Sequence, residues 1–122
     1  MFTRIDHVAL HVGDLDRSIE FYETNFGFRT YFQHETPGGV AIAYLQLGDT
    51  ILELASVPDG AMRGFHFCLE TDNFEAAFDA LSGNGVEVIQ APHTTAARAP
   101  RETEWRRTVF GGPDGEQIEI RG

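Results

Sequence analysis

Lysine is missing from this sequence: all nine basic residues are arginine, against 19 acidic residues, and the net charge is −10. Without lysine, Schiff-base chemistry and lysine general bases are excluded from the candidate mechanisms. The acidic charge also argues against a nucleic-acid partner, because phosphate groups are bound by basic surfaces.

Cysteine is nearly absent as well, since Cys68 is the single one. An intrachain disulfide and a zinc cage built from thiolates are therefore excluded. No apolar run approaches the roughly 20 residues of a membrane-spanning helix, so no membrane partner is predicted. The N-terminus lacks a basic segment followed by an apolar one, which predicts an unprocessed, cytoplasmic protein.

The remaining composition is that of a packed globular protein. The chain has 122 residues, of which 42% are hydrophobic, and it contains ten phenylalanines. This length is enough to bury a core and is typical of one domain. We therefore expect a single domain over residues 1–122.

Strand and helix patterns follow the same order twice along the chain. The first module, residues 1–58, has a helical pattern at 15–26, with Asp14 as its N-cap and Gly27 as its end. Alternating patterns predict its strands at 5–12, 28–34, 40–47 and 50–56. The second module, residues 63–122, has a helix that begins after Asp72 or Asn73. Its strands are predicted at 64–71, 86–91, 105–110 and 116–121. Residues 57–63 form the connector, and the sequence predicts an α+β fold of two tandem βαβββ modules.

The repeat can be counted in residues. His7 and His66 are 59 positions apart, and Glu53 and Glu119 are 66 positions apart. The seven-residue excess fits inside the loop predicted at 92–104. Each module therefore carries one histidine on its first strand and one glutamate on its last strand, at equivalent positions.

These four side chains predict a metal site. Each glutamate lies inside an apolar strand, at Ile51–Leu54 and at Gln117–Ile120, where a carboxylate is costly unless it is paired or bound to a metal. A single strand histidine or glutamate is more often a core or surface residue, but the repeat brings all four into equivalent settings. Imidazole and carboxylate ligands suit Ni, Zn, Co, Mn or Fe as divalent ions.

A chemistry follows from this ligand set. Four protein ligands on an octahedral ion leave two positions open, for water or for two neighbouring oxygens of a substrate. A metal placed in this way polarises a carbonyl and stabilises an enediolate, while a carboxylate moves the proton. Glu119, with Glu53 as its counterpart, is the predicted proton carrier.

Three further residues are weaker candidates for substrate binding. His11 shares the face of the first histidine, although polar filling of the strand explains it equally well. Cys68 shares the face of the second histidine, and an inert buried thiol is its alternative interpretation. Arg106, or its neighbour Arg107, is a candidate anchor for an anionic substrate, and the register of the strand decides which of them points inward.

Two segments resemble a known family. Residues 6–22, from Asp6 to Tyr22, are similar to the opening motif of the vicinal oxygen chelate superfamily, and Pro113 to Ile120 is similar to its closing motif. That superfamily includes glyoxalase I, methylmalonyl-CoA epimerase, fosfomycin-resistance thioltransferases, extradiol dioxygenases and bleomycin-binding proteins. The resemblance spans almost the whole chain.

The resemblance implies a fold and a site. Its modules form a curved, half-open mixed sheet around a central metal, usually in a homodimer. The metal positions of the family fall on the same four residues, His7, Glu53, His66 and Glu119. A glutamate at the second position is similar to glyoxalase I, whereas the epimerases usually have glutamine there.

Three departures from the glyoxalase I pattern argue against glutathione as part of the substrate. His11 stands where many of those enzymes have arginine, and Val57 stands where a glutathione-contacting asparagine is common. Gly112 replaces the aspartate that usually precedes the closing Pro-Asp-Gly. None of these changes affects the metal set.

The leading hypothesis is a metal-dependent lyase or isomerase of the glyoxalase I type that acts on a small 2-oxo or 2-hydroxy carbonyl compound or thioester. One alternative is an Fe(II) ring-cleaving dioxygenase or a thioltransferase that uses only His7, His66 and Glu119. A second alternative is a non-catalytic protein that binds small molecules. The sequence names neither the metal nor the substrate, and it leaves open whether a site is built within one chain or from two.

Overall fold

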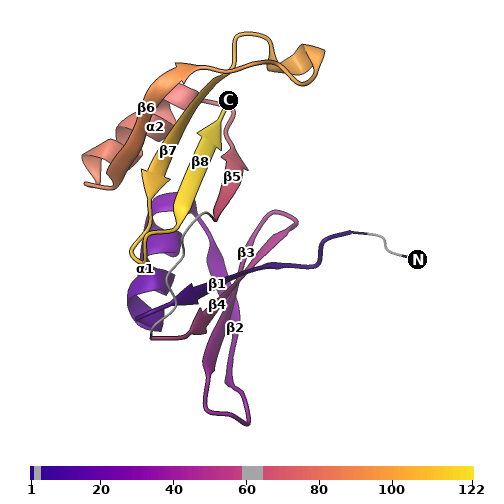
Figure 1. The fold of residues 1–122 in the computed structure, drawn as a ribbon, viewed down its shortest axis with the longest axis vertical. Helices are drawn as coiled ribbons and strands as arrows, with labels where there is room; N and C mark the ends of the chain where they lie inside the picture. Colours follow the sequence, from indigo (N-terminus) through magenta and orange to yellow (C-terminus); the bar gives the residue numbers. More distant parts are fainter. Residues whose placement is uncertain (2–3, 59–64) are drawn as a thin grey trace. The chain divides into compact units, whose positions relative to one another are not determined.

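The computed structural model describes residue 1, residues 4–58 and residues 65–122. The chain divides into two compact units, Met1–Met62 and Arg63–Gly122. Each unit has one α-helix and one four-stranded mixed sheet, in the order β-α-β-β-β (Figure 1). The predicted α+β fold with two βαβββ modules is confirmed.

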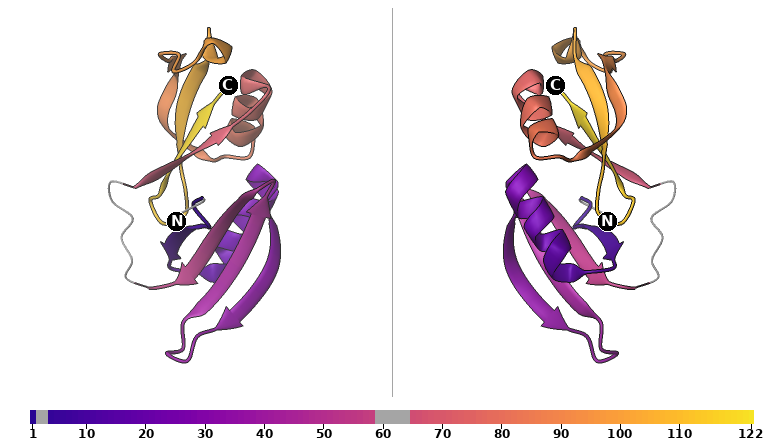
Figure 2. Two further views of the ribbon diagram at one scale, coloured as in Figure 1. Left: turned by 90° about the vertical axis from the view of Figure 1, so that its right-hand side faces the viewer. Right: turned by 90° about the vertical axis from the view of Figure 1, so that its left-hand side faces the viewer.

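The first unit contains one helix, α1 (Leu15–Phe26). Its four strands are β1 (Val8–Val12), β2 (Arg29–Glu35), β3 (Ala41–Leu47) and β4 (Thr50–Ser56). The sheet order is β1-β4-β3-β2. Strands β1 and β4 run parallel, and the other neighbours are antiparallel. Helix α1 covers one face of this sheet, and no helix among the described residues of the same unit covers the other face (Figure 2).

Local signals place α1 at its predicted bounds. The Asp14 side chain accepts a hydrogen bond from the Arg17 backbone N–H at 3.0 Å, which satisfies a free donor of the first turn. Gly27 ends the helix in the left-handed conformation, with φ of 74°. The buried face of the helix presents Tyr22 to a core that includes Leu10, Val12, Leu45, Leu52 and Leu54.

The second unit repeats this arrangement with one helix, α2 (Phe74–Gly83). Its four strands are β5 (His66–Glu70), β6 (Glu87–Thr94), β7 (Arg106–Gly111) and β8 (Gln117–Arg121). A short 3-10 helix, η1 (Pro100–Glu102), precedes β7. The sheet order is β5-β8-β7-β6. Of the two residues that the sequence left open as N-cap, Asn73 is used: its side chain accepts from the Ala76 N–H at 3.1 Å.

Several predicted boundaries were wrong. The first strand was expected from residue 5 but begins at Val8, because residues 5–7 separate from the start of β4 and leave a hollow there. Strand β6 continues through Thr94, so the segment 92–104 is only partly a loop and also contains η1. Residues 59–63 of the predicted connector, and Gly64 of the predicted strand 64–71, lie outside the described residues.

The pairing register of the strands places Glu53 and Glu119 at equivalent positions of the two sheets. In the parallel pairs, Glu53 lies beside Ala9 and Glu119 lies beside Cys68. In the antiparallel pairs, Glu53 lies beside Tyr44, whereas Glu119 lies beside Val109. In each unit these residues occupy the sheet face opposite the helix, because their strand neighbours fill the core.

Within the described parts of the chain, no helix is long and apolar enough to cross a lipid bilayer.

Candidate metal centre

In the first unit, His7 and Glu53 lie together. Nε2 of His7 is 3.1 Å from Oε2 of Glu53, whose side chain is only 15% exposed. His7 lies one residue before β1, and Glu53 is at the middle of β4. The parallel pairing of β1 with β4 brings the two side chains to the same face.

The other nitrogen of His7 is held by Asp6. Nδ1 is 3.0 Å from Oδ2 of Asp6, and this hydrogen bond is the main cause that lowers the pKa of Asp6. Because an ionised carboxylate only accepts, Nδ1 carries the proton and Nε2 faces Glu53. A carboxylate on the far nitrogen is the usual support of a metal-bound histidine.

Tyr44 is a third partner of this pair that the sequence reasoning missed. Its hydroxyl hydrogen-bonds the Glu53 carboxylate, which raises the pKa of Tyr44 above its ordinary value of 10.0. Its ring meets His7 edge-on, with 6.0 Å between ring centroids. The signal was available, because the short Gly48-Asp49 turn sets Leu47 opposite Thr50 and therefore Tyr44 opposite Glu53.

In the second unit, His66 and Glu119 lie near each other in the equivalent positions. Nε2 of His66 is 3.8 Å from Oε2 of Glu119, and the glutamate side chain is 12% exposed. Arg107 donates from a terminal guanidinium nitrogen to the same oxygen at 3.4 Å. Here a guanidinium occupies the role that the Tyr44 hydroxyl has in the first unit.

The strand register separates the two neighbouring arginines. Arg106 lies on the helix side of its sheet, where it pairs with Glu75 and lies over the ring of Phe74 at 5.1 Å. Arg107 lies on the face of Glu119. Of the two candidate anchors for an anionic substrate, Arg107 therefore accompanies the predicted metal ligands and Arg106 does not.

The remaining two weak candidates also lie on the predicted faces. His11 is exposed on β1, on the same side of the strand as Ala9. Cys68 is an exposed free cysteine directly beside Glu119 in the sheet. Partial desolvation of its sulfur and the charge of Glu119 raise the pKa of this thiol to about 11.

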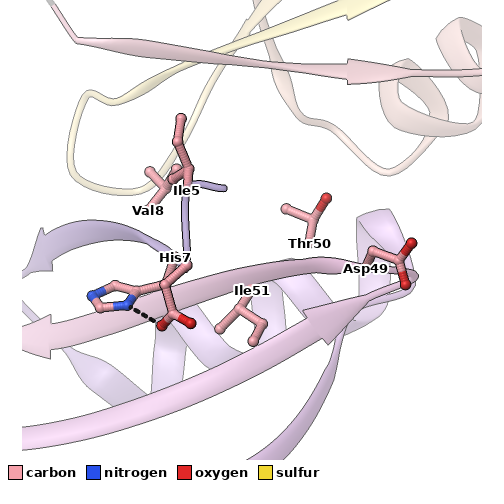
Figure 3. A pocket seen from close by; sticks show the side chains of 7 residues that line it. Ile5, His7, Val8, Asp49, Thr50 and Ile51 are labelled. Atoms are coloured by element: carbon pink, nitrogen blue, oxygen red, sulfur yellow. Dashed lines mark hydrogen bonds and ion pairs between the residues drawn. The ribbon is translucent and has the colours of Figure 1, made fainter. Parts of the chain in front are cut away.

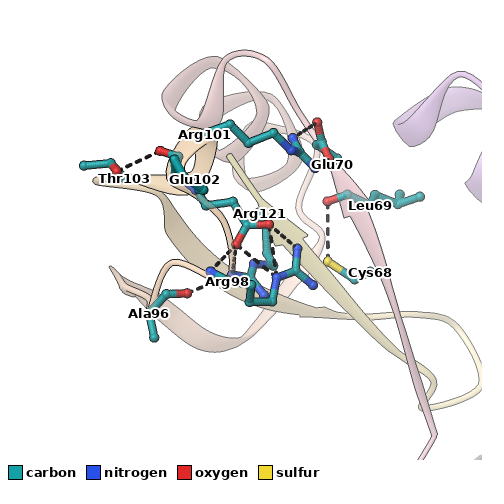
Figure 4. Close-up of polar contacts among 10 residues, drawn as sticks. Cys68, Leu69, Glu70, Ala96, Arg98, Arg101, Glu102, Thr103 and Arg121 are labelled. Carbon is teal, nitrogen blue, oxygen red and sulfur yellow. Dashed lines mark hydrogen bonds and ion pairs between the residues drawn. The ribbon is translucent and has the colours of Figure 1, made fainter.

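An ionic cluster built on the buried Glu102 and Arg121 adjoins this face of the second unit (Figure 4). Glu102 of η1 accepts from the guanidinium of Arg98 at 2.6 Å and lies 3.4 Å from that of Arg121. Hydrogen bonds from the Arg98 side chain and backbone lower the pKa of Glu102 to about 2. Arg121 also donates to the Ala96 carbonyl at 3.2 Å. No local pattern in the sequence identifies the buried Glu102 as the partner of Arg98, whose own side chain is 63% exposed.

The spacing within each pair is close to that of two ligands on one cation. Metal bonds of about 2.0–2.2 Å to nitrogen and oxygen place adjacent ligand atoms about 3 to 3.5 Å apart. The observed separations are 3.1 Å for His7 and Glu53 and 3.8 Å for His66 and Glu119. Among the described side chains, no group of three or more His, Cys, Asp and Glu gathers closely enough to hold a metal. Each unit therefore supplies half of the predicted ligand set.

A hollow of about 240 Å³ adjoins the first pair (Figure 3). It lies where residues 5–8 and 49–51 separate, and His7 lines it together with the carboxylate of Asp49 and the hydroxyl of Thr50. The hollow gives the histidine of the first unit access to solvent.

Comparison with known protein families gives one match over nearly the whole chain. The model of the Glyoxalase/Bleomycin resistance protein/Dioxygenase superfamily matches residues 4–120. A "Probable lactoylglutathione lyase" of Vibrio cholerae is 31% identical over 129 residues, which cover 96% of this chain and 88% of that protein. Human mitochondrial methylmalonyl-CoA epimerase is 32% identical over 87 residues, covering 61% of this chain and 49% of the epimerase. This chain thus spans about half the length of that relative.

Solved structures show the same fold. A glyoxalase family protein from Enterococcus faecalis superposes with a TM-score of 0.83 at 22% identity, over 99% of this chain and 98% of that chain. TnmS3, an antibiotic binding protein from Streptomyces sp. CB03234, superposes with a TM-score of 0.77 at 25% identity, over 98% and 94% of the two chains.

Proposed function

This chain belongs to the Glyoxalase/Bleomycin resistance protein/Dioxygenase superfamily, and we propose that it is a metal-dependent lyase or isomerase. Its substrate would be a small 2-oxo or 2-hydroxy carbonyl compound or thioester that binds the metal through two adjacent oxygens. Similarity to a lactoylglutathione lyase and to an epimerase supports this class of reaction.

One observation carries the proposal. Two units with the same fold each place a histidine nitrogen within 4 Å of a glutamate oxygen, at equivalent positions of the repeat. If the two pairs faced one ion, they would supply two nitrogen and two oxygen ligands, which suit a divalent metal.

The residues would have separate roles. His7, Glu53, His66 and Glu119 would hold the ion, which when bound would polarise the substrate carbonyl and stabilise the charge that develops beside it. Glu119, or its counterpart Glu53, would move the proton between neighbouring carbons. The guanidinium of Arg107 would bind an anionic group of the substrate.

Metal analysis of protein purified without chelator tests the proposal. We expect about one divalent ion, which would be Ni, Zn, Co, Mn or Fe, for each complete set of four ligands. Glu53→Ala and Glu119→Ala should each lose the metal and the activity toward 2-oxo hemithioacetals or 2-substituted acyl thioesters. Glu20→Ala, on the exposed side of α1, is the control and should keep both. Wild-type protein without metal would contradict the proposal.

A mixing experiment locates the site. If each site combines the first unit of one protomer with the second unit of another, inactive His7→Ala and His66→Ala proteins should regain activity when mixed. The heterodimer would then hold one intact site and one doubly altered site. If each site lies within one protomer, mixing should restore nothing. The homodimer is itself part of this proposal.

Two other functions have some support. With His7, His66 and Glu119 alone as ligands, the site would suit Fe(II) and either oxygen chemistry or thiol transfer. Oxygen uptake in the presence of a catechol would favour the dioxygenase.

Similarity to an antibiotic binding protein supports a non-catalytic binding role. A purified protein that contains no metal but still binds small molecules would favour this role.

A further inference from the structure

A β-bulge gathers aromatic side chains beside the first metal-binding pair. On β2, Thr30 pairs with Leu45 and Phe32 pairs with Tyr44, so Tyr31 is an extra residue in the ladder. A bulge sets two residues of one strand against one residue of its partner and re-aims their side chains. The rings of Tyr31 and Phe32 accordingly both lie close to Tyr44, at 6.3 Å and 6.2 Å between centroids.

His34 extends this cluster along the same face. Its ring lies 5.3 Å from Phe32 and 6.2 Å from Tyr44, at interplanar angles of 31° and 13°. The ring planes of Phe32 and Tyr44 make an angle of 36°. Three rings thus have roughly parallel planes, and with Tyr31 they form what we call the aromatic face (Tyr31, Phe32, His34, Tyr44).

The aromatic face is exposed. Tyr31 is 53% exposed and Phe32 is 52% exposed. Scattered exposed apolar residues are ordinary, but a contiguous exposed patch on a small protein often marks a binding site.

The aromatic face ends at the candidate ligands. Tyr44 belongs to it and also hydrogen-bonds Glu53, and His7 meets the Tyr44 ring edge-on. An apolar surface therefore runs directly to two groups that are placed to bind a cation. This combination suits a molecule with a flat apolar part and polar oxygens next to it.

The second unit has the same bulge without the rings. Val88 pairs with Phe110 and Gln90 pairs with Val109, which leaves Ile89 as the extra residue. The residues that correspond to Tyr31, Phe32 and Tyr44 are accordingly Ile89, Gln90 and Val109. Because the corresponding bulge of the second unit carries no aromatic cluster, a bulge at this position does not itself require the rings of the first unit.

We propose that the aromatic face is the ring-binding part of the substrate site, and that the substrate carries a flat aromatic or conjugated group beside its two chelating oxygens. The ring would stack on Phe32 and Tyr44 while the oxygens face His7 and Glu53. The chelating half of this inference rests on the proposed function. The ring-binding half rests on the aromatic face alone.

Two chelators with the same head group test it. Benzohydroxamate and acetohydroxamate both present two adjacent oxygens, and only the first carries a ring. In calorimetric titrations of the Zn-loaded protein, benzohydroxamate should bind about tenfold more tightly, as expected for one stacked ring. In Phe32→Ala and Tyr31→Ala the ratio should fall towards one, while affinity for acetohydroxamate and metal content stay unchanged.

Ile89→Ala is the matched control, because this residue holds the equivalent bulge position in the second unit and is also exposed. It should keep the wild-type ratio. Equal affinity of wild-type protein for the two chelators, or a ratio that Phe32→Ala leaves intact, would overturn the inference.

A second measurement separates this inference from the proposed function. If the protein takes up no metal, saturation-transfer NMR with benzohydroxamate still tests the aromatic face. The ring protons should receive saturation in wild-type protein and lose it in Phe32→Ala; no transfer in wild-type protein would refute ring binding. If Tyr31→Ala or Phe32→Ala instead converts a dimer to monomer in sedimentation without changing ligand binding, the aromatic face is a subunit contact and the inference fails.

Discussion

The two units share a backbone but differ in what they bury. Among the described residues, the first unit buries apolar side chains with Ser18 as its one buried polar residue. The second unit buries five polar or charged residues, which are Glu102, Thr108, Glu116, Glu119 and Arg121. Buried charges are costly unless they are paired, so the second unit depends on specific ionic and hydrogen-bonded contacts where the first depends on apolar packing.

The same difference extends to the candidate ligands. The Glu53 carboxylate has the neutral hydroxyl of Tyr44 as its hydrogen-bond partner, whereas the Glu119 carboxylate accepts a hydrogen bond from the guanidinium of Arg107. The first unit adds an aromatic face and the second adds a positive group. The candidate ligands of the two units therefore lie in unlike surroundings, although the two backbones repeat.

The largest predicted effect concerns the turn before β8. A Cβ at Gly112 would lie 2.2 Å from Cδ of Glu116, which is fully buried and accepts from the Asp114 N–H at 2.9 Å. Gly112→Ala should displace this side chain and lower the free energy of unfolding by about 1–3 kcal/mol. Urea unfolding followed by the fluorescence of Trp105 measures it.

Gly83→Ala is the control within the same unit, since a Cβ at this position would meet no atom within 4 Å. It should be neutral or slightly stabilising, because alanine favours a helix. Equal effects of the two substitutions would show that Glu116 does not fill the space beside Gly112.

The support of the two histidines is also unequal. His7 has Asp6 on its Nδ1, whereas the residue before His66 is Phe65. Loss of such a support usually weakens metal binding about 10- to 100-fold. Asp6→Asn should show a loss of this size in competition with a chromophoric chelator. Arg4→Ala, which removes only an exposed partner of Asp6, should not; an unchanged affinity in Asp6→Asn would argue against His7 as a ligand.

Cys68 and Ala9 offer a further test, since each lies beside the glutamate of its unit. With its pKa near 11, Cys68 should react with iodoacetamide at pH 8 roughly 20-fold more slowly than an unperturbed thiol. The rate should rise steadily to about pH 11. A cysteine introduced by Ala9→Cys in a Cys68→Ala background lies beside Glu53, and it should also react more slowly than an unperturbed thiol if a neighbouring carboxylate helps to slow Cys68.

A further predicted effect is a pH dependence that belongs to the second unit. The pKa of Glu102 falls from its ordinary 4.5 to about 2 in the folded protein. A depressed carboxyl pKa stabilises the fold above the unfolded value, and this contribution is lost as the pH falls from about 4.5 to about 2. Glu102→Gln should lower the urea midpoint at pH 7 but have less effect towards pH 2. A difference independent of pH would contradict the ionic role.

Much of the fold was predictable because its signals are local. The bounds of α1 follow from Asp14, Gly27 and an apolar stripe, and β4 lies at its predicted position. Strand ends were less predictable, since β1 begins at Val8 and β6 extends to Thr94 according to which neighbours are available for pairing. The contribution of all four predicted ligands to one metal site stays a prediction.

By itself the sequence determined the repeat, the α+β modules and the residues that lie at equivalent positions, because periodicity and spacing are properties of the chain alone. Only the tertiary structure decided that Arg107 rather than Arg106 accompanies Glu119, that Tyr44 bonds Glu53, and that a bulge brings Tyr31 and Phe32 to the same ring. Each of these depends on strand register, where a shift of one residue moves a side chain to the opposite face of the sheet.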